Sequence, residues 1–361
     1  MKEKSAIIFG AGAIGRGFLA PLLYKLNYSI SFVDKNKNLI KKLKKRHSYK
    51  AAITKEKNYQ IEEIKIADVF NINQKIDIQK YDVAFCCVGP SQYKKIAHKF
   101  KHARLIISCE NDSFSAIHLR KILGNKNIYF GIPDVITSNT ASKELLKIDD
   151  LMTVTEQGVL VLQKNKYKFP KKILQLNKNE IEVHWRAKLF IHNAPHAILA
   201  YLGALKKYKY VHQAMNDKDI RKIVIGSMTE ITKGIINAGY IPKKFAEKYK
   251  KKEIKRFSNK LLYDSILRVA REPLRKLGKE NRIILALRIA QWSNKFPTYT
   301  ATGLKAALNF FHSTDLESVY LQKLRKNFTD SEVLEKICGI EQTDPLNNFC
   351  LQQDLSKFIK K

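Results

Sequence analysis

The sequence lacks the features that would place it among membrane-spanning or disulfide-stabilised proteins. No apolar run approaches the roughly 18–20 residues that a helix needs to cross a bilayer, and the first apolar run is too short for a secretory signal. The five cysteines are odd in number and show no CxxC or other metal-ligand spacing. We therefore expect a cytoplasmic protein with no structural disulfide, no bound metal and no membrane partner.

Acidic residues are also scarce: 33 Asp and Glu stand against 67 Lys and Arg, a formal net charge of +34. A charge of this size raises a nucleic-acid hypothesis. The lysines are spread along the whole chain, however, and runs such as 41–46 and 248–252 are more simply interpreted as solvated helix faces or loops. We expect no specific nucleic-acid partner, and a diffuse positive field that speeds encounter with anionic substrates. Sequence-independent binding at physiological salt would favour the alternative.

Short apolar runs alternate with helical patterns in the N-terminal half, as in a doubly wound sheet. The run at 83–88 is continuously apolar, which is typical of a parallel strand buried on both faces. The other strand candidates lie at 6–9, 30–33, 64–66, 105–108 and 128–130, with one or two more at 152–162. We predict an α/β fold with a Rossmann-type doubly wound parallel sheet over residues 1–187.

The pattern changes near residue 188, and helical periodicity dominates from there. The predicted helices cover 197–205, 220–238, 261–277, 283–292, 301–311 and 331–337. A length of 361 residues and a hydrophobic content of 45% suffice for two domains with a core in each. We therefore predict a mainly α-helical second domain over residues 188–361, in a monomer or small homo-oligomer.

A glycine-rich motif follows the first strand candidate, at Gly10-Ala11-Gly12-Ala13-Ile14-Gly15. In a dinucleotide fingerprint Gly10 permits the tight turn, Gly12 lets the backbone approach the pyrophosphate, and Gly15 allows close helix packing. Asp34 ends the second strand about 20 residues further on, where a carboxylate bonds the adenosine ribose and favours NAD over NADP. Val88 and Gly89 follow a later strand, where the nicotinamide side of the cofactor would lie.

A compact polar set at Lys188, Asn193 and His196 directly precedes an apolar helical stretch. One interpretation is a helix start with Asn193 as N-cap, Pro195 in the first turn, and solvated lysine and histidine. The other makes Lys188 a proton acceptor, with Asn193 and His196 as hydrogen-bond partners of a substrate. That role requires desolvation or nearby positive charge to lower the pKa of the lysine towards neutrality.

Ordered motifs in both halves resemble those of the polyol-specific long-chain dehydrogenases, over most of the chain. The motifs stand at 10–18, 46–49, 88–90, 108–111, 188–190, 193, 196–197, 200–203, 256–259 and 268–277. The resemblance implies metal-independent hydride transfer between a polyol carbon and NAD. It implies that Lys188 is the general base and that Asn193 and Asn111 form an oxyanion site that holds the developing alkoxide. It also implies that His196 binds and orients a substrate hydroxyl.

A basic cluster is the candidate site for a sugar phosphate, comprising Arg268, Arg271, Arg275 and Lys276. Guanidinium groups bind phosphate oxygens bidentately. The three arginines would share one face of a helix by their three- and four-residue spacings, unless Pro273 breaks it. The alternative is a solvated basic face. With a phosphate site, the resemblance implies NAD-dependent interconversion of a polyol phosphate and a keto-sugar phosphate, with mannitol 1-phosphate and fructose 6-phosphate as the expected pair.

Two positions depart from the family pattern. The family's Asp-Arg-Ile-Val-Pro is replaced by a segment with Val135 in place of the arginine, and Gly158 stands where an aromatic residue is expected. These changes keep two alternatives open: a dehydrogenase acting on a related polyol or sugar acid, and a non-catalytic NAD-binding relative.

Overall fold

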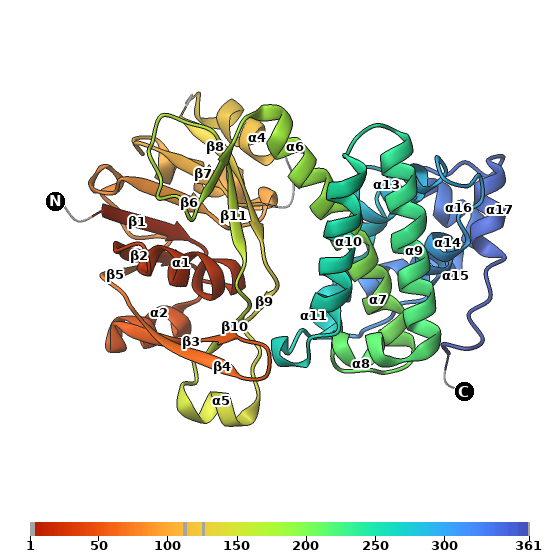
Figure 1. Ribbon diagram of the computed structural model, residues 1–361, viewed down its shortest axis with the longest axis horizontal. Coiled ribbons are helices and arrows are strands. Elements are labelled where there is room, and N and C mark those ends of the chain that lie inside the picture. Colours follow the sequence, from red (N-terminus) through yellow and green to blue (C-terminus); the bar gives the residue numbers. More distant parts are fainter. Residues whose placement is uncertain (1–3, 111–113, 125–126, 360–361) are drawn as a thin grey trace. The chain divides into compact units, whose positions relative to one another are not determined.

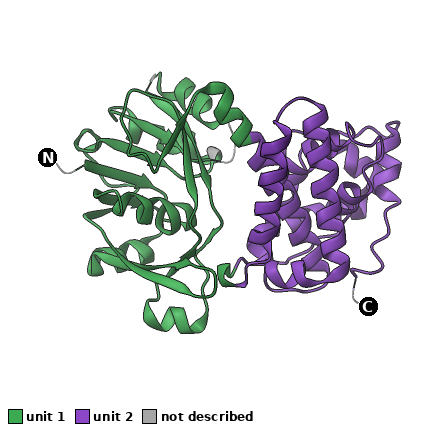
Figure 2. Cartoon of the chain, in the orientation of Figure 1, with its two compact units in different colours: residues 1–185, 261–263 green, residues 186–260, 264–361 purple. Residues whose placement is uncertain are grey.

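The computed structural model describes residues 4–110, 114–124 and 127–359. The chain forms two compact units, shown in green and purple in Figure 2. Unit 1 contains residues 1–185 and 261–263, and unit 2 contains residues 186–260 and 264–361. Among the described residues, none of the helices combines the length and the apolar character that crossing a membrane requires.

Unit 1 is built on an eight-stranded sheet in the order β12-β11-β8-β7-β6-β1-β2-β5 (Figure 1). In this order, the six neighbouring strands β8, β7, β6, β1, β2 and β5 pair in parallel, whereas β11 is antiparallel to β8. Their bounds are β1 (Lys4–Phe9), β2 (Tyr28–Asp34), β5 (Asp68–Asn71), β6 (Val83–Cys86), β7 (Ile106–Ser108), β8 (Ile128–Asp134), β11 (Val159–Gln163) and β12 (Leu174–Leu176). The predicted Rossmann-type parallel sheet is confirmed.

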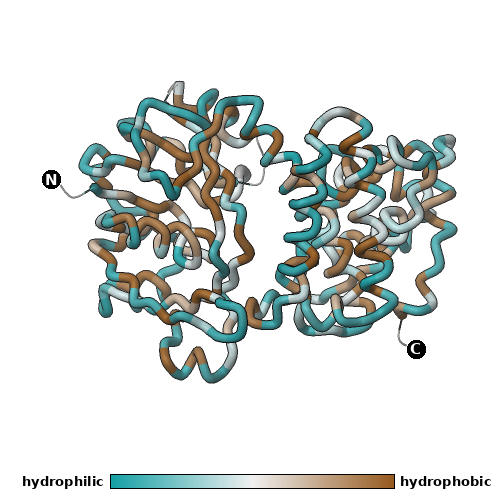
Figure 3. The backbone as a smooth tube through the Cα atoms, in the orientation of Figure 1, coloured by the Kyte–Doolittle hydropathy of each residue, from teal (hydrophilic) through white to brown (hydrophobic). Residues whose placement is uncertain are grey.

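Both faces of this sheet are buried along its central strands, which explains why β6 is continuously apolar. Ile8 and Phe85 belong to one buried cluster, while their chain neighbours Ile7 and Ala84 belong to another. Figure 3 shows the corresponding hydrophobic segments along the central strands of unit 1. The connecting helices are η1 (Gly15–Leu19), α1 (Ala20–Tyr24), α2 (Lys37–Arg46), η2 (Ile78–Lys80), η3 (Pro90–Gln92), α3 (Tyr93–Ile96), η4 (Ala97–Phe100), α4 (Ser115–Leu123), α5 (Lys143–Ile148) and α6 (Lys178–Arg186).

A second, smaller sheet was not predicted. It has the order β4-β3-β10-β9, with β3 (Ser48–Thr54), β4 (Tyr59–Lys65), β9 (Thr137–Ser138) and β10 (Thr153–Thr155). The strand candidate at 64–66 falls at the end of β4, in this sheet and not in the parallel one. The apolar stretch at 152–162 is divided between β10 and β11, which belong to different sheets.

Unit 2 is helical, as predicted, and α7 (Ala194–Leu205) is its most deeply buried helix, with every residue buried from Ala194 to Gly203. A helix that is apolar on all sides must pack inside a bundle. The surrounding elements are η5 (Ala187–Asn193), α8 (Val211–Asn216), α9 (Lys218–Asn237), α10 (Lys243–Phe257), η6 (Lys260–Leu262), α11 (Ile266–Ala270), α12 (Pro273–Leu277), α13 (Arg282–Ala290), α14 (Thr298–Leu308), α15 (Leu316–Asn327), α16 (Asp330–Val333), η7 (Leu334–Cys338) and α17 (Pro345–Leu351). The short helix η6 is divided between the units: Lys260 belongs to unit 2, whereas its other two residues belong to unit 1.

The single helix predicted over 261–277 is wrong. The segment contains η6, α11 and α12, and the backbone between α11 and α12 turns through Glu272 at φ +60°. Pro273 begins α12, where a residue without an N–H group is tolerated. The residue before a proline is pushed out of the helical conformation, which explains the break.

Candidate active site

The glycine motif of unit 1 makes a tight turn between β1 and η1. Gly10 has φ +99° and donates its N–H to the Val33 carbonyl at 2.8 Å. A Cβ on Gly15 would lie 2.0 Å from the Gly10 carbonyl oxygen, so only glycine allows this approach. A Cβ on Gly12 would meet no heavy atom of the described residues within 4 Å. The backbone at Gly12 is therefore open to a ligand, as a dinucleotide pyrophosphate requires.

Asp34 lies beside this turn, as predicted from its position at the end of β2. Its Oδ2 accepts the Ala11 N–H at 2.8 Å, and its Oδ1 accepts the Asn36 N–H at 2.8 Å. The carboxylate is thus fixed at the glycine turn, where it can accept hydrogen bonds from ribose hydroxyls. Val88 approaches from the end of β6, with its Cγ1 3.2 Å from the place a Cβ on Gly10 would take, and Gly89 next to it is exposed.

The Arg16 side chain holds the glycine turn through a hydrogen bond to its backbone, and this role was not predicted. Its buried guanidinium donates to the Ala11 carbonyl at 2.7 Å and to the Leu151 carbonyl at 2.6 Å. Burial lowers the pKa of Arg16 from its ordinary value, against the opposing effect of Tyr49 and nearby carboxylates. The only sequence signal was its place inside the motif at 10–18, which does not reveal what the side chain contacts.

Lys188 and Asn193 lie in η5, a π-helical turn of unit 2 that runs directly into α7, which carries His196. All three are buried, with exposed fractions of 6%, 7% and 7%. A π-helical turn, with its i→i+5 hydrogen bonds, brings residues five apart to one side of the helix, and such turns occur frequently at functional sites.

The interpretation of this segment as a capped helix start with solvated side chains is wrong. Asn193 has helical backbone angles, and among the described residues its side chain makes no capping hydrogen bond. Lys188 and His196 are buried instead of solvated. Asn111, the second predicted oxyanion donor, lies outside the described residues.

Two buried histidine–carboxylate pairs lie next to this set. His192 Nδ1 is 2.5 Å from Glu253 Oε2, and the other oxygen of Glu253 accepts from Arg256 at 2.5 Å. His196 Nε2 is 2.8 Å from Asp264 Oδ2, within ion-pair distance although the angles are too bent for a good hydrogen bond. The two imidazole rings are 5.1 Å apart between centroids. Sequence reasoning missed both carboxylates, because each is far from its histidine along the chain.

Burial and neighbouring charges shift the pKa values of His192 and Asp264 in this cluster. Burial lowers the pKa of His192 to about 4, although Glu253 acts in the opposite direction. Burial alone would raise the pKa of Asp264, but the Arg268 guanidinium and the neighbouring His196 outweigh it and hold the pKa below its usual range. Asp264 is therefore ionised at neutral pH, while His192 is neutral.

The predicted phosphate cluster is divided by the break between α11 and α12. Arg268 is bound to Asp264, Arg275 pairs with Glu272 at 2.6 Å, and the buried Lys276 donates to the Arg271 carbonyl. The Arg271 side chain is 64% exposed. The expectation that the three arginines share one face of one helix is wrong, because this face does not continue through the left-handed turn at Glu272.

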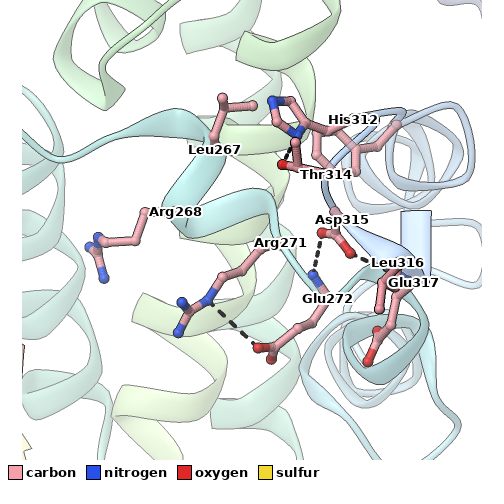
Figure 4. A pocket seen from close by; sticks show the side chains of 10 residues that line it. Leu267, Arg268, Arg271, Glu272, His312, Thr314, Asp315, Leu316 and Glu317 are labelled. Atoms are coloured by element: carbon pink, nitrogen blue, oxygen red, sulfur yellow. Dashed lines mark hydrogen bonds and ion pairs between the residues drawn. The ribbon is translucent and has the colours of Figure 1, made fainter. Parts of the chain in front are cut away.

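A hollow of about 560 Å³ lies beside the broken helix. Figure 4 shows the Arg268 and Arg271 side chains extending in the same direction, with Glu272 close to Arg271. The lining residues are Leu267, Arg268, Arg271, Glu272, Phe310, His312, Thr314, Asp315, Leu316 and Glu317. Two of the four predicted basic residues thus line one cavity, whereas Arg275 and Lys276 are not among its lining residues. Within the described ranges, no group of three or more His, Cys, Asp or Glu side chains is arranged to hold a metal ion.

Comparison with known proteins matches both units. The family model described as the mannitol dehydrogenase Rossmann domain matches residues 4–131, and the mannitol dehydrogenase C-terminal domain matches residues 180–340. A protein of Caldanaerobacter subterraneus named mannitol-1-phosphate 5-dehydrogenase is 31% identical over 94% of this chain and 95% of its own. A protein of the same name from Clostridium acetobutylicum is 29% identical over 95% and 96%.

Two solved structures share the fold. Mannitol 2-dehydrogenase of Pseudomonas fluorescens, in a ternary complex with NAD and D-mannitol, has a TM-score of 0.76 and 16% identity over 97% of this chain and 90% of its own. A substrate-free D-sorbitol dehydrogenase has a TM-score of 0.65 and 16% identity over 96% and 94%.

Proposed function

Because the chain belongs to the mannitol dehydrogenase family, we propose that it is an NAD-dependent dehydrogenase that interconverts mannitol 1-phosphate and fructose 6-phosphate. The observation that carries the proposal is the joint burial of Lys188, Asn193 and His196 on one continuous helix. A relative that only senses NAD would have little chemical reason to keep this polar set. The name shared by the relatives over nearly the full length favours the phosphorylated substrate.

The reaction assigns a separate role to each polar group. Bound NAD supplies the hydride acceptor. Lys188, in its neutral form, accepts the proton of the hydroxyl that is oxidised, and it returns this proton when the ketone is reduced. Asn193, together with Asn111, donates hydrogen bonds to the oxygen on which negative charge develops, and such donors are worth about 2.7–4 kcal/mol each. His196 orients a neighbouring substrate hydroxyl.

The residues of unit 1 fit the cofactor. The open backbone at Gly12 admits the pyrophosphate, and Asp34 is held at the turn to receive the ribose hydroxyls. A carboxylate at this place repels a 2′-phosphate, so we propose NAD and not NADP. The remaining cofactor contacts proposed are with Gly10, Ala11, Ala13, Ile14, Gly15, Val88 and Gly89.

Arg268 and Arg271 are the proposed ligands of the substrate phosphate, because they line the same hollow and guanidinium groups bind phosphate in a bidentate manner. Arg275 and Lys276 would act by holding Glu272 and the Arg271 backbone in place. The cytoplasmic location and the monomeric or small homo-oligomeric state also stay proposals.

An NADH oxidation assay with fructose 6-phosphate tests this function, with unphosphorylated fructose as the comparison. Replacing Lys188 by Ala should lower turnover by about 10²–10⁴-fold and leave NADH binding intact. Lys233→Ala, at an exposed lysine of α9, is the matched control and should keep full activity. Near-normal turnover in Lys188→Ala would rule out the mechanism, and NADH binding without turnover of any polyol phosphate would favour a non-catalytic relative.

A further inference from the structure

Asp264 lies two residues before α11, and its side chain faces a ring nitrogen of His196. Its side chain is 4% exposed and lies between two basic groups: Oδ2 is 2.8 Å from His196 Nε2, and Oδ1 is bound to Arg268. The contact with Arg268 spans one turn, from residue i to residue i+4. One carboxylate therefore connects the substrate-orienting histidine to a proposed phosphate ligand.

The backbone around Asp264 is anchored on both sides. The Asp264 carbonyl accepts from the Val211 N–H at 2.9 Å, and the Ile266 N–H donates to the Lys209 carbonyl at 3.0 Å. These two bonds enclose an antiparallel bridge between Tyr210 and Ser265. The carboxylate is thus presented from a fixed stretch of chain, which a positioning residue requires.

The His196 ring is held from its face as well. It stacks on Phe257 with a centroid distance of 4.9 Å and an interplanar angle of 15°. Stacking fixes the ring plane, and the contact with Asp264 decides which nitrogen points to the carboxylate. An unprotonated Nε2 at 2.8 Å from a carboxylate oxygen would set two lone pairs against each other. A neutral His196 ring therefore carries its proton on Nε2, although the hydrogen-bond angles are bent.

We propose that Asp264 is a positioning residue that holds His196 in the Nε2–H tautomer, so that Nδ1 accepts a hydrogen bond from a substrate hydroxyl. This inference rests on the proposed function, since it assumes that His196 contacts the polyol. Arg268 keeps the carboxylate ionised and oriented, so the phosphate ligand and the hydroxyl ligand are set by one shared anion. A carboxylate that fixes the tautomer of a histidine in this way is a general device of active sites.

The first test is a long-range ¹H–¹⁵N correlation spectrum of the full chain labelled at histidine, with His196 assigned through His196→Gln. The inference requires a protonated Nε2 in the wild-type protein, and a proton on Nδ1 would overturn it. This measurement needs neither substrate nor turnover, so it decides the tautomer even if the proposed function fails in the NADH oxidation assay.

The second test compares Asp264→Asn with Asp264→Glu. With the neutral amide, His196 should populate both the Nε2–H and the Nδ1–H tautomer. The kcat/KM for fructose 6-phosphate should fall by at least about tenfold, and the Kd for NADH should not change. The carboxylate variant should retain the Nε2–H signature and a smaller loss. If Asp264→Asn melts at a lower temperature but keeps the wild-type tautomer and kcat/KM, Asp264 is merely structural and the inference is wrong.

Discussion

Val135 fills the space in front of Gly158. A Cβ on Gly158 would lie 2.5 Å from the Cβ of Val135 and 2.9 Å from the Asp134 carbonyl oxygen. The two positions adjoin the end of the antiparallel pair β8–β11, where Asp134 is registered with Val159. They are the same two positions at which the sequence departs from the family pattern, so the structure shows the two departures to be neighbours in space.

We therefore expect the two positions to be energetically coupled. Gly158→Ala should lower the free energy of unfolding by about 1–3 kcal/mol, because its Cβ cannot fit without a shift of Val135. Val135→Gly removes the nearest contact but not the Asp134 carbonyl, so the double variant should recover only part of the loss. A double-mutant cycle by chemical denaturation measures the coupling. Strictly additive effects would show that the contact is unimportant.

The glycine motif allows cofactor binding to be separated from folding. Gly12→Ala places its Cβ in open space, so we expect stability within about 0.5 kcal/mol of wild type. The same methyl group would project towards the pyrophosphate and should weaken NADH binding by at least about tenfold, or about 1.4 kcal/mol. NADH titration followed by fluorescence measures the affinity.

Gly15→Ala is the matched comparison. Its Cβ would lie 2.0 Å from a backbone carbonyl, so this variant should lose about 1–3 kcal/mol of stability or more. Equal melting temperatures for the two variants would contradict the assignment of Gly12 to the ligand and Gly15 to packing.

Local patterns were enough to predict the parallel sheet and the glycine turn. The central strands of this sheet are short runs buried on both faces, and the turn is set by neighbouring glycines. The sequence signals of both features therefore lie within a few residues. The second sheet could not be predicted in this way, since β3 pairs with β10 about a hundred residues away. Likewise, no local signal links His196 to Asp264 or His192 to Glu253.

The segment before α7 shows how a local rule can mislead. Asn193 and Pro195 follow the usual pattern of a helix start. In the structure the chain is already helical before Asn193. The wider π-helical turn of η5 ends two residues before Pro195, which has no N–H group to donate. The polar set is therefore buried inside a continuous helix, an arrangement that propensity alone does not indicate.

Arg271 and Arg275 provide a matched pair for locating the phosphate. Arg271 lines the hollow of unit 2 and is largely exposed, whereas Arg275 is paired with Glu272. Arg271→Ala should raise KM for fructose 6-phosphate by about tenfold or more, since a charge-assisted hydrogen bond contributes about 1.5–3 kcal/mol. Activity on unphosphorylated fructose, where measurable, should not change. Steady-state kinetics with both substrates measures this, and a larger effect of Arg275→Ala would place the phosphate elsewhere.

The burial of His192 should make stability depend on pH in mildly acidic solution. In the folded chain burial lowers the pKa of His192 to about 4, against an ordinary value of 6.5. Between these values the unfolded chain binds a proton that the folded chain does not, so unfolding is favoured as the pH falls. The lowered pKa of Asp264 changes stability with pH only below the ordinary carboxylate pKa, which lies outside the interval in which His192 acts.

His192→Gln keeps a hydrogen-bond donor for Glu253 but cannot titrate. As the pH falls from about 6.5 to about 4, wild type should lose up to about 3 kcal/mol more unfolding free energy than this variant. Chemical denaturation across the interval measures the difference, and any titration of the other histidines cancels between the two proteins. His102→Gln, at an exposed histidine, is the control and should follow the wild-type curve. Parallel curves for wild type and His192→Gln would show that His192 takes up its proton equally in the folded and unfolded chains.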